Sequence, residues 1–413
     1  MVLRLDVINA TSSKEIKEKL FSSLEHYEDI LPASKTVKIL IKPNLNANMN
    51  ALTGNTTDLR LLAAVIEYLK EKGYGSISIG EGTNSGYYRN GISVISRLKI
   101  DEIAKYYGVK MIDLNYSDLV YVNFEDGVRA GIAKECMEAD LLINMPKLKT
   151  HFEVGMSVCL KNLMGCLVGQ TNKKKTHKSL ARNILHINEN IKPNLHIVDS
   201  LIAMEGLGPT RGKPKKMGII ILGTNPYLID LLCAKIANFD YRLITTLKLA
   251  EDKGIITKDY HEFIQSQDIT GLIKEFEKPK ANVFASFIHS PKRQKYFLAV
   301  RNTKFFSYLA STQLFGKLLF LSGLRQDNFI KEEMSFEGLT FHTGRCIKGC
   351  TKCTDYCPVG LKLPDEFENR YNNCIGCLYC FLVCPAKAIE FKGKLGFMEE
   401  QLRQYDKIIR EII

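Results

Sequence analysis

The chain has no apolar run long enough to span a membrane, and its N-terminal residues show no basic start followed by a long apolar stretch. These absences predict a protein without a transmembrane segment or a secretory leader. We therefore expect a cytoplasmic protein, a location that also suits unpaired cysteines.

Several short ligand-binding motifs are missing as well. No Gly-x-Gly-x-x-Gly follows a predicted strand and no Walker-type Gly-Lys-Ser/Thr loop is present, so nicotinamide and ATP chemistry have no motif support. Flavin is not excluded, because its sites lack one short signature. No recognisable nucleic-acid-binding module is present, and aromatic residues are not interleaved with the basic groups. We therefore do not expect nucleic acid as a partner.

Basic residues are in excess, with 57 Lys and Arg against 45 Asp and Glu and a formal net charge of +12. Part of this excess is grouped, in one set of Lys173, Lys174, Lys175, Lys178 and Arg182 and a second set of Arg211, Lys213, Lys215 and Lys216. Such groups attract anionic lipid, a phosphorylated or carboxylated substrate, or an acidic redox partner. A merely solvated surface is the alternative.

Eight of the twelve cysteines lie in two C-terminal runs. The runs read Cys346-x3-Cys350-x2-Cys353-x3-Cys357-Pro and Cys374-x2-Cys377-x2-Cys380-x3-Cys384-Pro. This spacing is typical of two-cluster bacterial ferredoxins, in which the fourth cysteine of each run ligates the other cluster. We predict two 4Fe-4S clusters, one held by Cys346, Cys350, Cys353 and Cys384 and the other by Cys357, Cys374, Cys377 and Cys380.

The first run has one residue more than this pattern between Cys346 and Cys350, which puts Cys346 in doubt as a ligand. Gly344 and Gly349 give the loop freedom to absorb the extra residue. A disulfide framework would need an oxidising compartment, and structural zinc would need only four ligands per site. The other cysteines lie in apolar segments and are predicted to be core residues: Cys136, Cys159, Cys166 and Cys233.

The first part of the chain alternates short apolar segments with amphipathic ones. We predict strands at 2–9, 36–45, 74–82, 109–114, 139–147, 195–204 and 217–223, and helices at 13–31, 56–73 and 226–239. This alternation predicts an α/β fold, with a mainly parallel sheet and helices on both faces. The cysteine runs add a small ferredoxin-like α+β iron–sulfur domain.

Four segments are expected along the chain: 1–255, 256–340, 341–395 and 396–413. The first is the α/β domain, the second a basic and aromatic connection, the third the cluster domain and the last a C-terminal helix. An apolar helix at 307–324 is predicted within the connection. It would pack against the cluster domain, or else make peripheral membrane contact or dock a partner.

Polar residues follow several predicted strands, at the edge of a parallel sheet where ligands bind. Lysines there can hold an anion, namely Lys42, Lys147 and Lys149. Glu81 and His151 are candidate catalytic proton donors. The alternatives are solvated lysines, a simple turn at Glu81 and, for His151, a capping or buried hydrogen-bonding histidine. Lys161 and Asn162 fall within a predicted apolar helix at 154–169, where burial of a lysine is costly unless it is paired or bound to an anion.

Five stretches resemble the domain of unknown function 362 family, over residues of about 36–255: IKPNLN, GEG, LLINMPKLKTHFEVGMSVCLKNLMGCLVG, KKKTH and IVDSLIAMEGLGPTRG. That family is often joined to ferredoxin-type cysteine runs, and the resemblance implies no established reaction. It implies that the family's motif positions are occupied by Lys42, Asn44, Glu81, Lys147, Lys149, His151, Lys161, Asn162, His177, Asp199 and Glu205. A more distant resemblance in architecture is to the lactate racemase group, which uses a nickel-bearing nucleotide cofactor. These residues by themselves establish no nickel.

The sequence therefore predicts an iron–sulfur oxidoreductase. Electrons would come from a low-potential redox protein, pass through two 4Fe-4S clusters and reach a small anionic substrate or cofactor at the strand ends. A further, unidentified cofactor could occupy the N-terminal domain. One alternative is a non-catalytic, ferredoxin-like carrier or electron-transfer subunit that docks to a partner enzyme. The other is an assembly or scaffold protein with structural clusters.

Overall fold

The computed structural model describes residues 3–124, 127–279, 303, 312, 329–367 and 373–413. Within these residues a nine-stranded sheet has the order β1-β11-β10-β7-β2-β3-β4, and off this path β8 pairs with β10 and β9 pairs with β8. The strands are β1 Leu5–Asn9, β2 Ile39–Pro43, β3 Ile77–Glu81, β4 Lys110–Asp113, β7 Leu141–Met145, β8 Lys147–His151, β9 Gly155–Ser157, β10 Leu195–Glu205 and β11 Lys213–Gly223.

Five neighbouring strands of this sheet, β10, β7, β2, β3 and β4, run parallel. The edge strand β1 and its neighbour β11 pair antiparallel. Every residue of β2 and β7 is buried, as expected for central strands that are covered on both faces. The prediction of a mainly parallel sheet in an α/β fold is confirmed.

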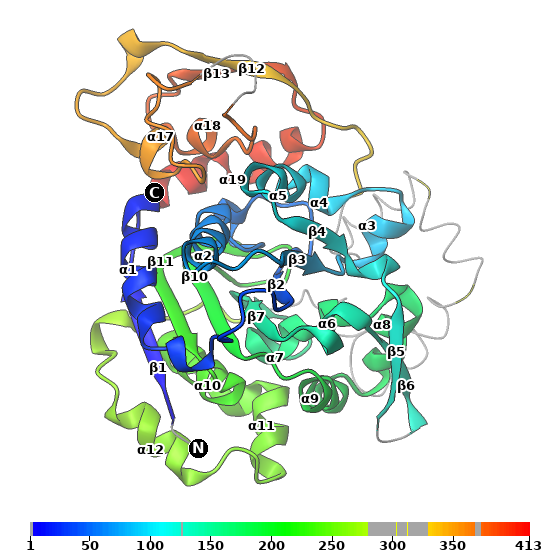
Figure 1. The fold of residues 1–413 in the computed structure, drawn as a ribbon. Coiled ribbons are helices and arrows are strands. Elements are labelled where there is room, and N and C mark those ends of the chain that lie inside the picture. The colour runs from blue at the N-terminus through cyan, green and yellow to red at the C-terminus, as the bar shows by residue number, and fades with distance from the viewer. Residues whose placement is uncertain (1–2, 125–126, 280–302, 304–311, 313–328, 368–372) are drawn as a thin grey trace.

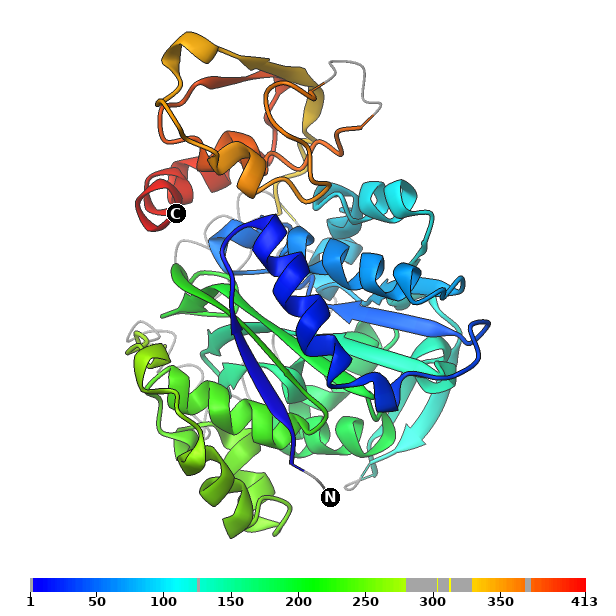
Figure 2. The ribbon, with the colours of Figure 1, turned by 60° about the vertical axis from the view of Figure 1, so that its left-hand side comes forward.

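Helices cover both faces of the sheet (Figure 2). Successive strand residues point to opposite faces. Ile39 and Ile41 accordingly join a core with α1 Ser13–Glu25, α2 Leu59–Glu71 and α5 Ile100–Tyr107. On the other face, Leu40 joins a core with α7 Cys159–Asn162, α9 Leu180–Asn190 and α10 Pro226–Ile236. The remaining elements of this part are α3 Ser85–Arg89, α4 Val94–Arg97, α6 Lys134–Glu138, α8 Gly169–Thr176, α11 Thr245–Asp252, α12 Lys258–Ser266 and the hairpin of β5 Leu119–Asn123 and β6 Arg129–Ala133.

The predicted helix at 154–169 is wrong. This segment forms β9, the short helix α7 and a 3₁₀ turn at Leu163–Cys166. Gly155 has φ +86°, and a Cβ atom there would lie 2.7 Å from the Leu243 carbonyl oxygen. The apolar residues of the segment belong to a strand, a short helix and a 3₁₀ turn, so the apolar composition does not indicate one continuous helix. The helix predicted at 307–324 lies outside the described residues, apart from Thr312.

The C-terminal part forms a small unit at one end of the molecule (Figure 1). Its strands β12 Ser335–Phe341 and β13 Ile389–Lys394 pair antiparallel. Two short helices, α17 Lys352–Asp355 and α18 Tyr379–Val383, carry cysteines, and α19 Met398–Ile412 closes the chain. We call residues 335–394 the cluster unit. Helix α19 contacts both α18 and β11, so it packs between the cluster unit and the sheet.

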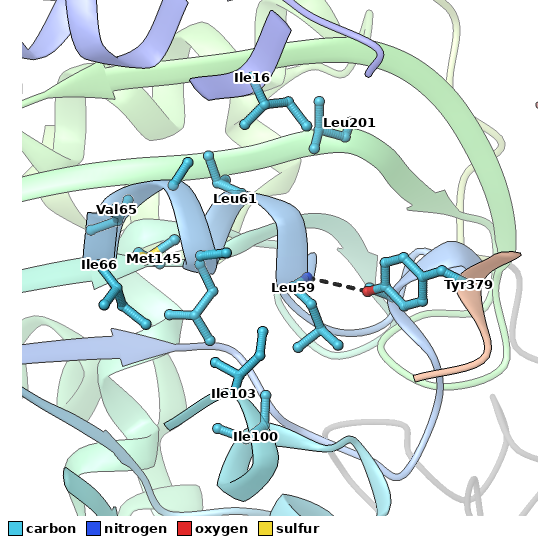
Figure 3. Close-up of a cluster of buried hydrophobic side chains, with 14 of the residues drawn as sticks. Ile16, Leu59, Leu61, Val65, Ile66, Ile100, Ile103, Met145, Leu201 and Tyr379 are labelled. Atoms are coloured by element: carbon cyan, nitrogen blue, oxygen red, sulfur yellow. Dashed lines mark hydrogen bonds between the residues drawn. The ribbon is translucent and has the colours of Figure 1, made fainter. Parts of the chain in front are cut away.

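The cluster unit shares a hydrophobic core with the α/β domain (Figure 3). Tyr379 reaches the start of α2, where its hydroxyl accepts a hydrogen bond from the Leu59 backbone N–H at 3.2 Å. The Arg60 guanidinium lies 4.0 Å from the centroid of the Tyr356 ring. These contacts fix the cluster unit on the N-terminal end of α2.

Candidate functional site

Three lysines lie at the carboxyl edge of the sheet, and all three are fully buried: Lys42, Lys147 and Lys149. Lys42 comes from β2, and the other two come from β8, which follows β7 after one proline. A buried ammonium group is costly unless a partner stabilises its charge. The partners of each lysine therefore indicate what the lysine does.

Lys42 forms a buried ion pair with Glu81, with 2.8 Å between Nζ and Oε2. The parallel pairing of β2 with β3 brings the two residues to the same edge. Glu81 also accepts a hydrogen bond from the Leu45 backbone N–H at 3.2 Å. A Cβ atom at Gly165 would lie 1.9 Å from Glu81 Oε1, so this position has no room for a larger residue.

Lys147 pairs with Asp199 on β10, with 2.9 Å between Nζ and Oδ2. The Asp199 carboxylate also accepts hydrogen bonds from the backbone N–H groups of Asp58 and Leu201, at 2.6 and 3.1 Å. Both side chains are completely buried. The pair thus has its charges and hydrogen bonds satisfied within the protein, and it holds the start of α2 against β10.

Lys149 belongs to a chain of buried amides. Its Nζ donates to Asn44 Oδ1 and to the Asn55 carbonyl oxygen, both at 2.8 Å. The Asn44 amide donates to Asn162 Oδ1 at 2.7 Å, and the Asn162 amide donates to Asn144 Oδ1 at 2.7 Å. This chain connects the ends of β2 and β7 with α7. Asn144 was not among the predicted residues because it lies inside an apolar strand.

His151 is buried, and its Nδ1 accepts hydrogen bonds from the backbone N–H groups of Glu153 and Val154, at 3.1 and 3.4 Å. This assigns the ring proton to Nε2. Burial, reinforced by Lys161, His177 and Lys149, holds the pKa of His151 well below its usual value. The ring is therefore neutral near pH 7 and offers Nε2–H as a hydrogen-bond donor.

Lys161 differs from the three buried lysines. It is half-buried on α7 and forms no hydrogen bond or ion pair with any residue that the structure describes. Burial lowers its pKa against the opposing charge of Glu153, and Lys42 lowers it further. Lys161 in turn lowers the pKa of His151. Lys161 is thus a cation without an ion-paired carboxylate in the described part of the chain, and Glu153 is the acidic residue whose charge acts on it.

Lys173 contributes a further cation beside Glu81. Its Nζ donates to the carbonyl oxygens of Gly82 and Thr83 at 2.8 and 3.0 Å and to Asn115 Oδ1 at 2.6 Å. Burial lowers its pKa to about 8, although Glu81 opposes the change. In the sequence Lys173 is only one member of a basic group. Its contacts arise because the tertiary fold brings α8 close to the end of β3.

His177 and Glu205 lie further from this arrangement. His177 Nδ1 is 3.7 Å from Glu153 Oε2, and its charge acts on His151. Glu205 accepts from Lys215 Nζ at 2.6 Å and from the Glu277 backbone N–H at 2.9 Å. Among the described residues no hydrogen bond links Glu205 to the other predicted site residues. We call Lys42, Glu81, Lys149, His151, Lys161 and Lys173 the strand-end cluster; the catalytic and binding roles of its members stay predictions.

The four scattered cysteines are buried, as the sequence predicted. The thiols of Cys136 and Cys166 interact with each other, and Lys42 and Glu81 both act on Cys136. The interaction with Cys166 is the largest cause of a raised pKa at Cys136, followed by burial. The protonated thiol of Cys136 therefore lies near Cys166 and the Lys42–Glu81 pair.

Electrostatic influences among the cysteines of the cluster unit follow the predicted crossed pattern in part, since Cys353 also acts on Cys380 of the other predicted cluster. Cys353 lies within electrostatic range of Cys350 and Cys384. Cys377 lies within range of Cys357, Cys374 and Cys380. In the described residues no three such side chains converge as the ligands of one metal ion do. Cysteine thiolates are the ligands that 4Fe-4S clusters use.

Backbone amides point at several of the cysteine sulfurs, a second feature of iron–sulfur sites. The N–H groups of Leu361, Gly376 and Ala388 donate to the sulfurs of Cys357, Cys374 and Cys384, at 3.4, 3.4 and 3.2 Å. These bonds are available to stabilise the charge of thiolates and of a cluster. The ligand positions fit the predicted group, with Cys346 outside these contacts.

The two predicted clusters have unlike positions. Cys346 and Cys350 of the first run are exposed, whereas Cys380 of the second run is buried. The second run faces the α/β domain, because the Asn50 side-chain amide donates to the Cys377 carbonyl oxygen at 3.3 Å. We call the cluster predicted at Cys357, Cys374, Cys377 and Cys380 the inner cluster and the other one the outer cluster.

One loop connects the inner cluster with the strand-end cluster. It runs from Asn44, which binds Lys149, to Asp58 at the start of α2, and Asn50 lies in its middle. Gln401 of α19 holds this loop as well, by accepting from the Asn50 backbone N–H at 2.9 Å. The sequence analysis missed Asn50; the asparagine-rich composition of residues 44–55 was the available signal.

Comparison with known proteins agrees with this division. Residues 39–235 match the domain of unknown function family DUF362, and residues 370–390 match a 4Fe-4S binding domain. The thylakoid-associated protein sll1697 of a Synechocystis species is 28% identical over 239 residues, which are 53% of this chain and 68% of that protein. No helix in the described residues is long and apolar enough to cross a membrane.

A solved structure with a partial likeness is the lactate racemase apoprotein from Thermoanaerobacterium thermosaccharolyticum. It is 12% identical, with a TM-score of 0.35, and the match covers 56% of this chain and 57% of that one. The predicted resemblance to a DUF362 domain joined to a C-terminal ferredoxin-type domain is confirmed by the matches of the two segments.

Proposed function

Because the chain carries a DUF362 domain at residues 39–235 joined to a C-terminal 4Fe-4S binding domain, we propose that it passes electrons from its clusters to a small anion at the strand-end cluster. The observation that carries this proposal is Lys161, an ammonium group without an ion-paired carboxylate among the described residues. A small anionic substrate or cofactor would supply the missing charge.

The neighbouring groups suit such a ligand. His151 offers Nε2–H because its Nδ1 is occupied by two backbone N–H groups. A charged donor and a neutral donor side by side can bind a carboxylate or phosphate oxygen together. Lys42 and Lys149 add positive potential, although their own hydrogen bonds are already made. We propose that Lys161 and His151 contact the anion directly and that Lys42, Lys149 and Asn44 hold the site in shape.

Proton supply is the second requirement of a coupled reduction. Glu81 is ion-paired with Lys42 and accepts a hydrogen bond from the Leu45 backbone N–H, so its Oε2 atom already has two partners. Lys173, with a pKa of about 8, is better matched to proton exchange near neutral pH. We propose Lys173 as the proton donor beside Glu81, and His151 as a hydrogen-bond donor rather than an acid.

The arrangement of the clusters supports electron flow toward this site. When bound, 4Fe-4S clusters supply electrons one at a time. The ligands of the inner cluster face the loop that also holds the strand-end cluster, through Asn50 and Asn44. The exposed first run is available to a low-potential redox protein. We propose that electrons enter at the outer cluster and leave from the inner one, in a protein of the cytoplasm.

Native mass spectrometry of anaerobically purified protein tests the proposal. We expect mass beyond the two clusters, and its loss in Lys161→Gln but not in Lys407→Gln, a matched change on the exposed face of α19. A ligand that purified Lys161→Gln retains in full would contradict the assignment. If no extra mass is found, titration with sulfate, phosphate and acetate gives the same comparison by calorimetry.

The pH dependence of sulfate binding is a second test. His151 is neutral above its lowered pKa, so binding should not weaken between pH 6 and pH 7.5, where an ordinary histidine loses its charge. Binding should fall as Lys161 loses its proton, at a pH below the usual lysine value of 10.5. A loss of binding centred near pH 6.5 would instead show that a charged histidine holds the anion.

The non-catalytic carrier remains the second candidate, and the exposure of Cys346 and Cys350 favours it. A carrier needs an accessible cluster but no ligand site in the α/β domain. It predicts a stoichiometric partner enzyme whose activity depends on these clusters, and unchanged electron delivery in Lys161→Gln. The two candidates therefore differ in the outcome of one substitution.

A further inference from the structure

Two basic groups that are far apart in the sequence meet on one surface of the molecule. Lys216 lies on β11, and Lys352 lies at the start of α17. Lys274 joins them, because its Nζ donates to the Lys216 carbonyl oxygen at 2.8 Å. Burial lowers the pKa of Lys216, and the charges of Lys352 and Lys274 lower it further. Lys352 and Lys274 thus each repel the ammonium group of Lys216.

The loop before Lys352 continues this surface along the first cysteine run. Residues 343–352, TGRCIKGCTK, contain Arg345, Lys348 and Lys352 and no acidic residue. Figure 1 shows the loop between β12 and α17 at the outer edge of the cluster unit. The cations therefore lie around ligands of the outer cluster.

The extra residue of the first run shapes this loop. The Cys350 backbone N–H donates to the Ile347 carbonyl oxygen at 3.1 Å, and Gly349 has φ +77°. A positive φ at the third position of such a turn favours glycine. Lys348 is exposed in this turn, and Ile347 is 56% exposed. The insertion thus places an apolar side chain and a cation beside Cys346 and Cys350.

These cations have few partners within the described chain, although Lys216 Nζ donates to the Ile413 oxygen at 3.4 Å. None of Lys216, Lys274, Lys348 and Lys352 forms an ion pair with a described Asp or Glu side chain. Grouped like charges without counterions are unfavourable, and a partner of opposite charge removes the repulsion. An exposed apolar residue surrounded by cations also has the composition of a protein interface, with an apolar centre and a charged rim.

We propose that Ile347, Lys348, Lys352, Lys216 and Lys274 form a docking surface for an acidic electron-transfer protein, which delivers electrons to the outer cluster. The proposal rests on the electron-transfer function proposed above. One electron leaves the reduced partner and reduces the outer cluster, and no bond is formed or broken. A protein partner is favoured over a membrane because the surface is centred on the cluster-ligand loop, where a bound redox centre would come close to the iron.

The test uses the full-length, anaerobic protein with both clusters and a reduced, acidic bacterial ferredoxin as the probe. Stopped-flow absorbance follows reduction of the clusters in the wild type and in the double variant Lys348→Glu/Lys352→Glu. We expect the rate constant at low salt to fall about tenfold or more in the variant, since opposite charges steer association. The wild-type rate should also fall as salt is raised.

Two controls separate this surface from other effects. Lys407→Glu makes the same charge change on α19, where the side chain is 88% exposed, and its rate should equal that of the wild type. Reduction by dithionite, a small reductant, should be the same in all variants. Equal ferredoxin rates in the wild type and in the double variant would overturn the proposal.

Binding is measured separately, so that the surface and the electron-transfer function can fail independently. Oxidised ferredoxin should bind the wild type in calorimetry and should bind the double variant at least tenfold more weakly. Binding without any reduction of the clusters would support the surface and overturn the electron-transfer function. Binding to anionic phosphatidylglycerol vesicles that the double variant loses, with unchanged ferredoxin rates, would assign the surface to a membrane and overturn its assignment to a protein.

Discussion

The two cysteine runs have nearly the same sequence pattern and opposite surroundings. In the first run Cys346 and Cys350 are exposed, and the residues between them are Ile347, Lys348 and Gly349. In the second run Cys380 is buried and lies next to Tyr379, which belongs to the core shared with α2. Ligand spacing determines what each run can bind, whereas the residues between the ligands determine what the bound group can face.

The spacer residues account for this difference physically. Ile375, Leu378 and Tyr379 between the ligands of the second run are all buried. Their apolar surface stabilises the contact with the α/β domain, at roughly 25 cal/mol for each Å² removed from water. In the first run, Lys348 and Gly349 between Cys346 and Cys350 form no such contact, whereas Tyr356, farther along the same run, is buried against Arg60. The second run is thus predicted to hold its cluster next to the protein core, and the start of the first run is predicted to hold its cluster at the surface.

The strongest way to break this comparison is to remove one ligand from each run. Cys380→Ser should lose the inner cluster and lower the free energy of unfolding of the whole chain, because its loop belongs to the shared core. Cys350→Ser should lose the outer cluster with a much smaller loss of stability, since its loop is exposed. Iron content and anaerobic guanidinium denaturation measure the two effects. Equal destabilisation by both substitutions would remove the distinction between an inner and an outer cluster.

The next effect concerns the side chain that joins the two units. Tyr379→Ala should lower the free energy of unfolding by about 3–5 kcal/mol, as for other large aromatic side chains removed from a core. Tyr379→Phe keeps the ring and loses only the hydroxyl that accepts from Leu59 N–H, which should cost about 1 kcal/mol. Urea denaturation of the cluster-loaded protein measures both. Ile347→Ala, the matched change in the first run, should leave stability within about 0.5 kcal/mol.

Much of the fold could be predicted from local patterns. Central strands such as β2 and β7 are continuous apolar runs, so their burial and their parallel arrangement follow from composition. The segment at 154–169 was misread because its apolar residues have helical spacing, whereas the close approach of Gly155 to Leu243 depends on the tertiary fold. The cysteine spacing also could not predict that the two runs have different surroundings, because the spacing identifies the ligands and not the residues around them.

The candidate site could be predicted only in part. Strand ends meet at one edge of a parallel sheet, so the proximity of Lys42 and Glu81 follows from the predicted strands. The choice of partners does not follow: Lys147 selects Asp199 because β8 inserts beside β10. That Lys161 has no ion-paired carboxylate among the described residues also could not be predicted, because pairing depends on the folded protein. The sequence pattern thus predicted where the charged residues lie, whereas the tertiary fold determines which residues pair with them.

A further effect, smaller than that of Tyr379→Ala, concerns Asn50, which bonds to the second run. Its amide donates to the Cys377 carbonyl oxygen, and its Oδ1 accepts from the Leu52 backbone N–H at 3.0 Å. Asn50→Ala loses both bonds and should lower the free energy of unfolding by about 1–2 kcal/mol. Asn50→Asp keeps the acceptor for Leu52, so it should recover part of this stability while the donor to Cys377 stays absent.

The same two variants report on electron transfer. Because Cys377 is a predicted ligand of the inner cluster, loss of the Asn50 donor should change the reduction potential of that cluster alone. The added negative charge in Asn50→Asp should make the inner cluster harder to reduce than Asn50→Ala does. Redox titration followed by electron paramagnetic resonance resolves the two clusters. An equal shift in both would mean that Asn50 acts on the whole cluster unit, and the assignment of the second run to the inner position would lose its electrochemical support.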